Sequence, residues 1–402
     1  MPVAGVFFAF AFAYFLSALL RAVTATLAPV FSAELGLRAG DLGLLAGAYF
    51  FGFAALQLPL GRALDRFGPR RTLLVLLSVA TLGCAAFAVA RSLPALTGAR
   101  VLIGAGMAAG LMAPLTCYRR ILLPTAQLRA NSWMLMTGSL GMVASTLPVQ
   151  WLLPYLGWRG LFWALALMLV LAMSLVAWLA PADDAGGGSR ALPQPGGYRT
   201  IIRHPLFVRL APLGFFVYGG LIAVQSLWAG PWLTSVSGWS AQQAAQGLFA
   251  INLCMLLAFL AWGAVMPRLS ARGILPLALI RWGLWPVLLL LAANIWLGAD
   301  AGAANWAAWC VACTFVSVSQ PAVGAAFPSA LAGRALSAFN LVIFAGVFCM
   351  QWGIGLLIDA LRGLGLAEAL AFRAAFAVFG LLCAAAYIWF LRAGPQGADN
   401  PG

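Results

Sequence analysis

The residues best suited to chemistry are polar side chains inside long apolar segments, where each such group is costly. One helix face of the first segment carries, at i, i+3, i+7 and i+10, the residues Tyr14, Ser17, Arg21 and Thr24. Arg21 lies roughly 14 Å from the nearer end of this segment, too deep for its charge to reach water easily. Its cation therefore suits an anionic group on a bound substrate. The alternative is an arginine that holds helices together through backbone carbonyls or neighbouring hydroxyls.

A segment in the second half of the chain has a similar face, which carries Tyr218, Gln225, Trp228 and Trp232. The Gln225 amide can donate and accept hydrogen bonds, and aromatic rings can stack on a planar or apolar substrate. For Trp232, near the end of its segment, a place in an interfacial aromatic belt is the favoured interpretation.

Two further amides, Asn340 and Gln351, are 11 residues apart and share one face of a later segment. Tyr49, Gln57 and Gln320 are weaker candidates, and any of these groups can instead hydrogen-bond a neighbouring helix. The expected substrate-binding set is Arg21, Tyr14, Ser17, Tyr218, Gln225, Trp228, Asn340 and Gln351.

The reactive residue types that are missing from the apolar segments narrow the range of possible functions. No aspartate or glutamate lies in the middle of an apolar segment, and the single histidine, His204, lies in a polar loop. Cys310 and Cys313 have C-x-x-C spacing without a second pair or a histidine nearby, so we expect structural thiols, no metal and no cofactor. An enzyme is not expected. Coupling to a proton or sodium ion, coupling through the substrate's own charge, and uncoupled transport all stay open.

Composition predicts that these groups lie in a lipid bilayer. Of 402 residues, 64% are hydrophobic and 8% charged, so the chain cannot cover itself in water. Windows of about 20 residues predict helical spans. There are twelve, at 4–30, 43–61, 72–90, 95–117, 131–153, 160–180, 208–234, 243–266, 274–296, 304–328, 338–358 and 370–391. The net charge of +14 comes from arginines in the short loops between spans, which excludes nucleic acid as the expected partner.

A polar stretch divides the spans into two sets of six. Residues 181–207 form the predicted linker between bundles at 1–180 and 208–392, and 393–402 form a tail. With a cytoplasmic N-terminus, the inner loops and tails hold 15 arginines and the outer loops hold 5. This bias predicts that both termini are cytoplasmic.

The loop after the second span carries a recognisable motif. The segment from Gly61 to Arg71 reads GRALDRFGPRR, and we expect a tight turn in which glycines supply positive φ or a close approach. It resembles the G-x-x-x-D-R-x-G-(P)-R-R loop between helices two and three of the major facilitator superfamily. The matching positions are Gly61, Asp65, Arg66, Gly68, Arg70 and Arg71. By this resemblance, Asp65 and the loop arginines latch the cytoplasmic ends of helices from both halves in the outward-facing state.

An internal repeat fits the same family. A shift of 202 residues pairs Pro29 with Pro231, Gly61 with Gly263 and Arg66 with Arg268. A shift of 205 pairs Arg129 with Arg334, Ser132 with Ser337 and Gly141 with Gly346. The resemblance implies an all-α membrane protein with twelve helices in two six-helix bundles related by pseudo-two-fold symmetry. Because Asp65 has no counterpart in the second copy, we expect an asymmetric gate.

Two other arginines lie within spans. The segment around Arg100 resembles the family's fourth-helix motif, L-x-x-x-R-x-x-x-G-x-G, whose arginine is associated with proton coupling or with packing against the first helix. Arg281 lies near the inner end of its span and is expected to snorkel to the headgroups.

The resemblance implies a secondary transporter that works by alternating access. We expect a monomer in the bacterial cytoplasmic (inner) membrane that takes up a small organic solute, with an anionic solute favoured by Arg21. The alternatives are an efflux antiporter and a membrane sensor that does not transport. The Gly-Pro and double-glycine signature of drug antiporters is missing after Gly138, which favours uptake.

Overall fold

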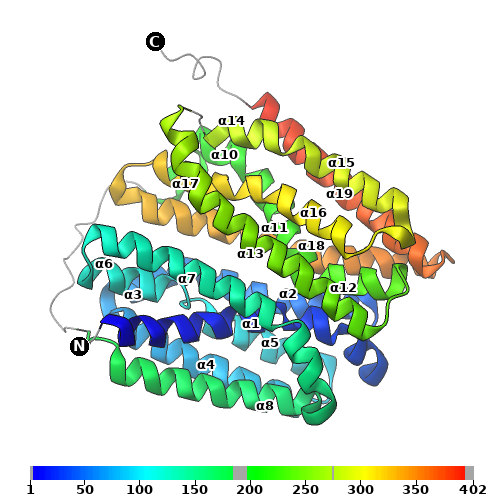
Figure 1. Ribbon diagram of the computed structural model, residues 1–402, viewed down its shortest axis with the longest axis horizontal. Helices are drawn as coiled ribbons and strands as arrows, with labels where there is room; N and C mark the ends of the chain where they lie inside the picture. The colour runs from blue at the N-terminus through cyan, green and yellow to red at the C-terminus, as the bar shows by residue number, and fades with distance from the viewer. Residues whose placement is uncertain (1–2, 184–196, 274–275, 394–402) are drawn as a thin grey trace.

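The computed structural model describes residues 3–183, 197–273 and 276–393, and every regular element in these ranges is a helix. A helix satisfies all of its own backbone amides, which a lipid environment demands of any spanning segment. Figure 1 shows α1–α8 in the lower half of the view and the helices from α10 onwards in the upper half, with their axes roughly parallel.

The first half of the chain forms eight helices. They are α1 (Val3–Leu35), α2 (Ala39–Ala55), α3 (Gln57–Phe67), α4 (Pro69–Val89), α5 (Leu93–Met107), α6 (Met112–Ile121), α7 (Pro124–Ala144) and α8 (Leu147–Leu179). The expected fifth span at 131–153 contains a break at Ser145 and Thr146, between α7 and α8, and α8 itself is divided by the non-helical Gly157.

The second half begins with a short helix and one long rod. The short helix is α9 (Tyr198–Ile202), and the rod comprises α10 (Pro205–Pro212), η1 (Leu213–Tyr218), α11 (Gly219–Ala223), η2 (Val224–Trp228), α12 (Ala229–Pro231) and η3 (Trp232–Val236). The three η segments of the rod are π-helical. The predicted linker at 181–207 therefore ends in helix, while its residues 184–196 lie outside the described part of the chain.

The remaining elements complete the second half. They are α13 (Ala241–Ala271), α14 (Pro276–Gly283), α15 (Trp285–Leu297), η4 (Gly298–Asp300), α16 (Ala303–Cys313), η5 (Thr314–Val318), α17 (Ser319–Ala325), α18 (Ser329–Gly363) and α19 (Glu368–Arg392). Within the described residues, ten helical segments are long and apolar enough to span a membrane, and the bent pair α2–α3 makes an eleventh. The count of twelve stays a prediction.

The molecule has two ends that are used as landmarks below. The motif end holds the start of α1 and the connection from α3 to α4, on the left of Figure 1; the far end holds the connection from α1 to α2. Most of the GRALDRFGPRR segment is not the turn expected from its sequence, because Gly61 to Phe67 are helical in α3. Only Gly68 connects α3 to α4, with φ +81° and ψ 165°.

Gly68 is fixed by the carboxylate of Asp183, which follows α8. The Asp183 oxygens accept hydrogen bonds from the Arg70 and Arg71 amides at 3.3 and 2.7 Å, so they satisfy free N–H groups at the start of α4. A Cβ on Gly68 would lie 2.2 Å from Cγ of Asp183. Gly61 differs, since no described atom lies within 4 Å of a Cβ built there.

These two glycines make a matched pair of mutations. Gly68→Ala is expected to destabilise the protein by about 1–3 kcal/mol, because its backbone angles are open almost only to glycine and the new methyl displaces Asp183. Gly61→Ala is expected to stabilise α3 by roughly 0.5–1 kcal/mol, since alanine loses less backbone entropy in a helix. Thermal unfolding of the two purified variants should shift in opposite directions. Equal shifts would contradict this account of the motif.

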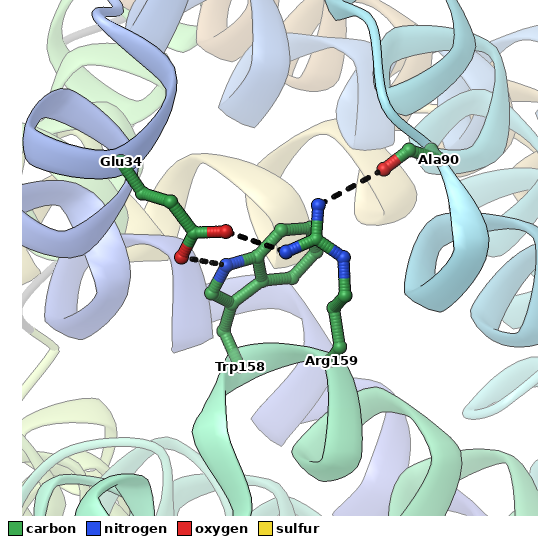
Figure 2. A network of polar contacts seen from close by, with 4 residues as sticks. All are labelled: Glu34, Ala90, Trp158 and Arg159. Carbon is green, nitrogen blue, oxygen red and sulfur yellow. Dashed lines mark hydrogen bonds and ion pairs between the residues drawn. The ribbon is translucent and has the colours of Figure 1, made fainter.

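At the far end, the first half is tied together around Glu34 (Figure 2). The Trp158 indole donates to Glu34 Oε2 at 2.7 Å, and Arg159 pairs with Glu34 Oε1. The Arg159 guanidinium also stacks over the Trp158 ring and donates to the Ala90 carbonyl. Gly157, with φ +61°, turns the chain so that both side chains reach α1.

The internal repeat is visible as repeated contacts. A Cβ on Gly141 of α7 would lie 2.3 Å from the Phe15 carbonyl oxygen of α1. A Cβ on its repeat partner Gly346 of α18 would lie 2.2 Å from the Phe215 carbonyl oxygen of η1. Each half therefore packs its fifth expected span against its first through the same glycine, as two-fold duplication requires.

Candidate functional site

A cavity of about 520 Å³ lies between the two halves of the molecule. Its walls come from α1 and α7 of the first half and from the rod, α13, η5 and α17 of the second half. The residues contributed by α13 run from near the middle of this helix towards its C-terminus, which lies at the motif end, so the cavity extends from the middle of the molecule in that direction. A concave, mostly apolar pocket with a few polar groups is the usual form of a small-molecule site.

Arg21 of α1 lines this cavity and is half-buried. Its guanidinium lies 5.7 Å from the ring centre of Phe53 and 6.0 Å from that of Phe344, one ring from each half, and beside Tyr14. Nε of Arg21 is buried and has no hydrogen-bond partner among the described residues. None of the described lining residues is acidic, so Arg21 faces the cavity as an uncompensated cation.

Four members of the predicted binding set line the cavity together: Tyr14, Arg21, Tyr218 and Gln225. The other four do not line this cavity, although Trp228 lines a second, smaller one. Ser17 contacts the Tyr49 hydroxyl, the Trp228 indole donates to the Gln351 carbonyl at 3.2 Å, and the Gln351 amide donates to Ser226. Asn340 accepts a hydrogen bond from Gln320. In this conformation each of the four contacts a neighbouring helix, and their part in substrate binding stays a prediction.

Sequence reasoning missed the contributions of α7 and α13. Asn252 of α13 accepts a hydrogen bond from Gln225 at 2.9 Å, which places an amide pair in the wall. Gln320, only a weaker candidate, also lines the cavity. Four methionines complete an apolar wall: Met136, Met142, Met255 and Met266. Methionine rarely signals a site in a sequence of this composition, because most apolar residues of a membrane protein face lipid or core.

Trp232 corrects another expectation. It is fully buried, with its ring 5.1 Å from that of Trp306 and 5.0 Å from that of Phe376, so it belongs to the core of the second half and not to an interfacial belt.

The two halves meet closely at the far end, beyond Arg21. A Cβ on Gly43 of α2 would lie 2.2 Å from the Gln351 carbonyl oxygen, and one on Gly355 of α18 would lie 2.3 Å from the Ala39 carbonyl oxygen. Asp359 of α18 accepts hydrogen bonds from the Ala39 and Gly40 amides at 3.2 and 2.8 Å, at the N-terminus of α2.

The same closure involves α1 and the rod. A Cβ on Gly230 would lie 2.7 Å from the Ala25 carbonyl oxygen. Beyond this contact lies a second cavity of about 270 Å³, lined by the repeat-related Pro29 and Pro231 and by Trp228. Gln225 and Trp228 are therefore neighbours in η2 that face different cavities.

This arrangement of helices has known counterparts. Residues 10–350 match the family model of the Major Facilitator Superfamily. The chain belongs to this superfamily. It is therefore a membrane transporter and not an enzyme. A search of curated proteins gives no match.

Solved structures of the superfamily share the fold. A bacterial homolog of the human lysosomal transporter Spinster, in an inward-facing and unoccupied conformation, aligns with a TM-score of 0.78 at 19% identity, over 96% of each chain. A D-xylose-proton symporter aligns with a TM-score of 0.75 at 15% identity, over 100% of each chain. Identities this low show the fold and leave the substrate open.

Arg100, in the segment that resembles the superfamily's fourth-helix motif, is fully buried in α5. Its NH1 donates to the Leu20 carbonyl at 3.0 Å and its Nε to the Leu45 carbonyl at 3.4 Å, while its guanidinium lies over the Tyr49 ring. It does not line the main cavity. These contacts favour packing of α1, α2 and α5 over a role in coupling.

At the motif end, Arg66 of the superfamily motif and its repeat partner Arg268 each contact a nearby residue. Arg66 packs over the neighbouring Phe67 ring, and Arg268 donates to the Ala264 carbonyl of its own helix. Asp65 is exposed. Among the described residues, these contacts of Arg66 and Arg268 stay within their own halves. The expected latch between halves belongs to a conformation closed at the motif end, and it stays a prediction.

Proposed function

We propose that this transporter carries a small organic anion across the cytoplasmic membrane by alternating access, with uptake as the favoured direction. The observation that supports this proposal most is Arg21, the one cation among the described residues that line the main cavity. A cation fixed between apolar walls, with no acid beside it, attracts a negative charge more strongly than it would in water.

The cavity walls suggest how such a substrate is held. Its charged group binds Arg21, with the hydroxyls of Tyr14 and Tyr218 nearby as further donors. Its apolar body packs against the methionines, whose flexible side chains adapt to varied shapes. A neutral polar group at the other end of the substrate hydrogen-bonds the Gln225–Asn252 amide pair.

The unequal number of loop arginines at the two ends of the molecule supports the cytoplasm as the side to which the cavity opens. The motif end carries the larger number of loop arginines and is predicted to be cytoplasmic. The described conformation, packed closely at the far end, then faces inward. The Gly43, Gly355 and Asp359 contacts form the closed outer gate. An efflux antiporter would use the same inward-facing cavity, and the absence of the drug-antiporter signature after Gly138 favours uptake.

Counterflow tests the proposal. Proteoliposomes loaded with an unlabelled carboxylate are diluted into the same labelled carboxylate, drawn from a panel of benzoate, 4-hydroxybenzoate, phenylacetate and lactate. We expect transient accumulation of at least one panel member over protein-free liposomes, and none for benzamide or benzylamine. Stabilisation of purified protein by a carboxylate without counterflow would indicate a sensor. Counterflow of the amine or amide instead would contradict an anionic substrate.

A further inference from the structure

Arg21 faces the main cavity as a cation, and none of the described acidic residues lies in the cavity wall to neutralise it. The nine are Glu34, Asp41, Asp65, Asp183, Asp184, Asp300, Asp359, Glu368 and Asp399. Asp184 and Asp399 lie outside the described residues, and the other seven lie at or beyond helix ends and line no part of the main cavity. The single histidine, His204, precedes α10 at the motif end and packs on Phe327.

Arg21 is also the one cation among the described residues that line the main cavity. The 202-residue repeat places Ala223 opposite Arg21, so the duplication did not double the charge. The polar groups that share the described wall are hydroxyls, amides and the indole of Trp262, which already donates to Thr314. One negative charge on a substrate therefore matches the cavity, and no described lining residue can take its place.

Alternating access passes through a state that is closed at both ends. With the far end already packed through Gly43 and Gly355, closing the motif end would enclose Arg21 between Phe53 and Phe344 without an anion. Enclosing an unpaired cation in an apolar space is unfavourable, whereas a cation paired with a carboxylate is compensated. The loaded protein should therefore change conformation quickly and the empty protein slowly.

We propose that this transporter is an obligatory exchanger of monoanions, in which each change of conformation requires an anion on Arg21. This inference rests on the proposed function and adds the mode of transport. Accumulation of one anion is then driven by the outward gradient of another, and no proton or sodium ion is needed.

The test compares loaded and empty proteoliposomes of the wild-type protein. The probe is the panel carboxylate that shows counterflow, with valinomycin and equal potassium on both sides to remove any membrane potential. We expect initial uptake to be at least tenfold faster into vesicles loaded with the unlabelled carboxylate, equivalent to about 1.4 kcal/mol in the barrier. Equal rates into loaded and empty vesicles would overturn exchange while leaving anion transport intact. Absence of counterflow for every panel anion would overturn both.

Two variants test whether Arg21 is the cause. Arg21→Lys keeps the charge, so the ratio of loaded to empty uptake should stay at tenfold or more. Arg21→Gln removes the charge, and the ratio of its residual uptake, measured at high carboxylate concentration, should fall towards one. A ratio that stays high in Arg21→Gln would overturn the mechanism. If that variant carries no measurable flux, the wild-type and Arg21→Lys comparisons still decide the inference.

Discussion

Replacing Arg21 with glutamine is expected to weaken binding of the transported carboxylate by about a hundredfold or more while leaving the fold intact. Loss of one partner from a desolvated charge pair costs about 2–5 kcal/mol, and each 1.4 kcal/mol is a factor of ten in affinity. The protein itself should tolerate the change. Arg21 faces a cavity, and each of its cation–π contacts with Phe53 and Phe344 stabilises the fold by only about 1 kcal/mol.

Dissociation constants from titration calorimetry of the purified variant measure this effect, with unfolding temperature as the check on folding. Arg281→Gln is the matched control, because Arg281 is also an arginine within a span but is exposed, packs over Trp282 and does not line the main cavity. Equal affinity in wild type and Arg21→Gln would refute Arg21 as the counter-charge. A large loss in Arg281→Gln would point to a general effect of charge.

The first helix shows how far spacing alone can predict a site. At 100° per residue, Tyr14, Ala18 and Arg21 fall within about 60° of one another, and all three line the cavity. Ser17 and Thr24 lie about 60–80° to one side of Tyr14, where Ser17 meets Tyr49 of α2. The sequence identifies the polar residues on a helix face. The packing of neighbouring helices then decides which of these residues line a cavity.

The motif in α3 and the start of α4 was predicted correctly as a family signature and wrongly as a turn. Arginine and leucine favour helix, so Gly61 and its neighbours continue as α3, and the chain turns only where Gly68 meets Pro69. The Asp183 carboxylate that fixes Gly68 is more than 110 residues away along the chain. A contact of that separation leaves no local pattern in a sequence.

The outer gate gives the second large effect. Gly355→Val is expected to lower counterflow by about tenfold to a hundredfold, because its side chain would meet the Ala39 carbonyl and the Gly40 backbone of the opposite half. Overpacking of this kind costs about 1–3 kcal/mol, and each 1.4 kcal/mol slows a rate tenfold. The strain falls between the halves and not within either one, so the far end is held open while each bundle stays folded.

Gly353→Val separates this effect from helix propensity. Gly353 lies two residues earlier in α18, is exposed, and has no described atom within 4 Å of a Cβ built there. Both variants introduce the same residue into the same helix, so any intrinsic cost of valine is shared. Counterflow near the wild-type rate in Gly353→Val and a large loss in Gly355→Val would show that closure of the far end is a step of transport. If Gly355→Val transports as fast as Gly353→Val, the close contact between α2 and α18 is a packing feature of one conformation. The outer gate must then lie elsewhere, and the Ala25–Gly230 contact is the next position to test.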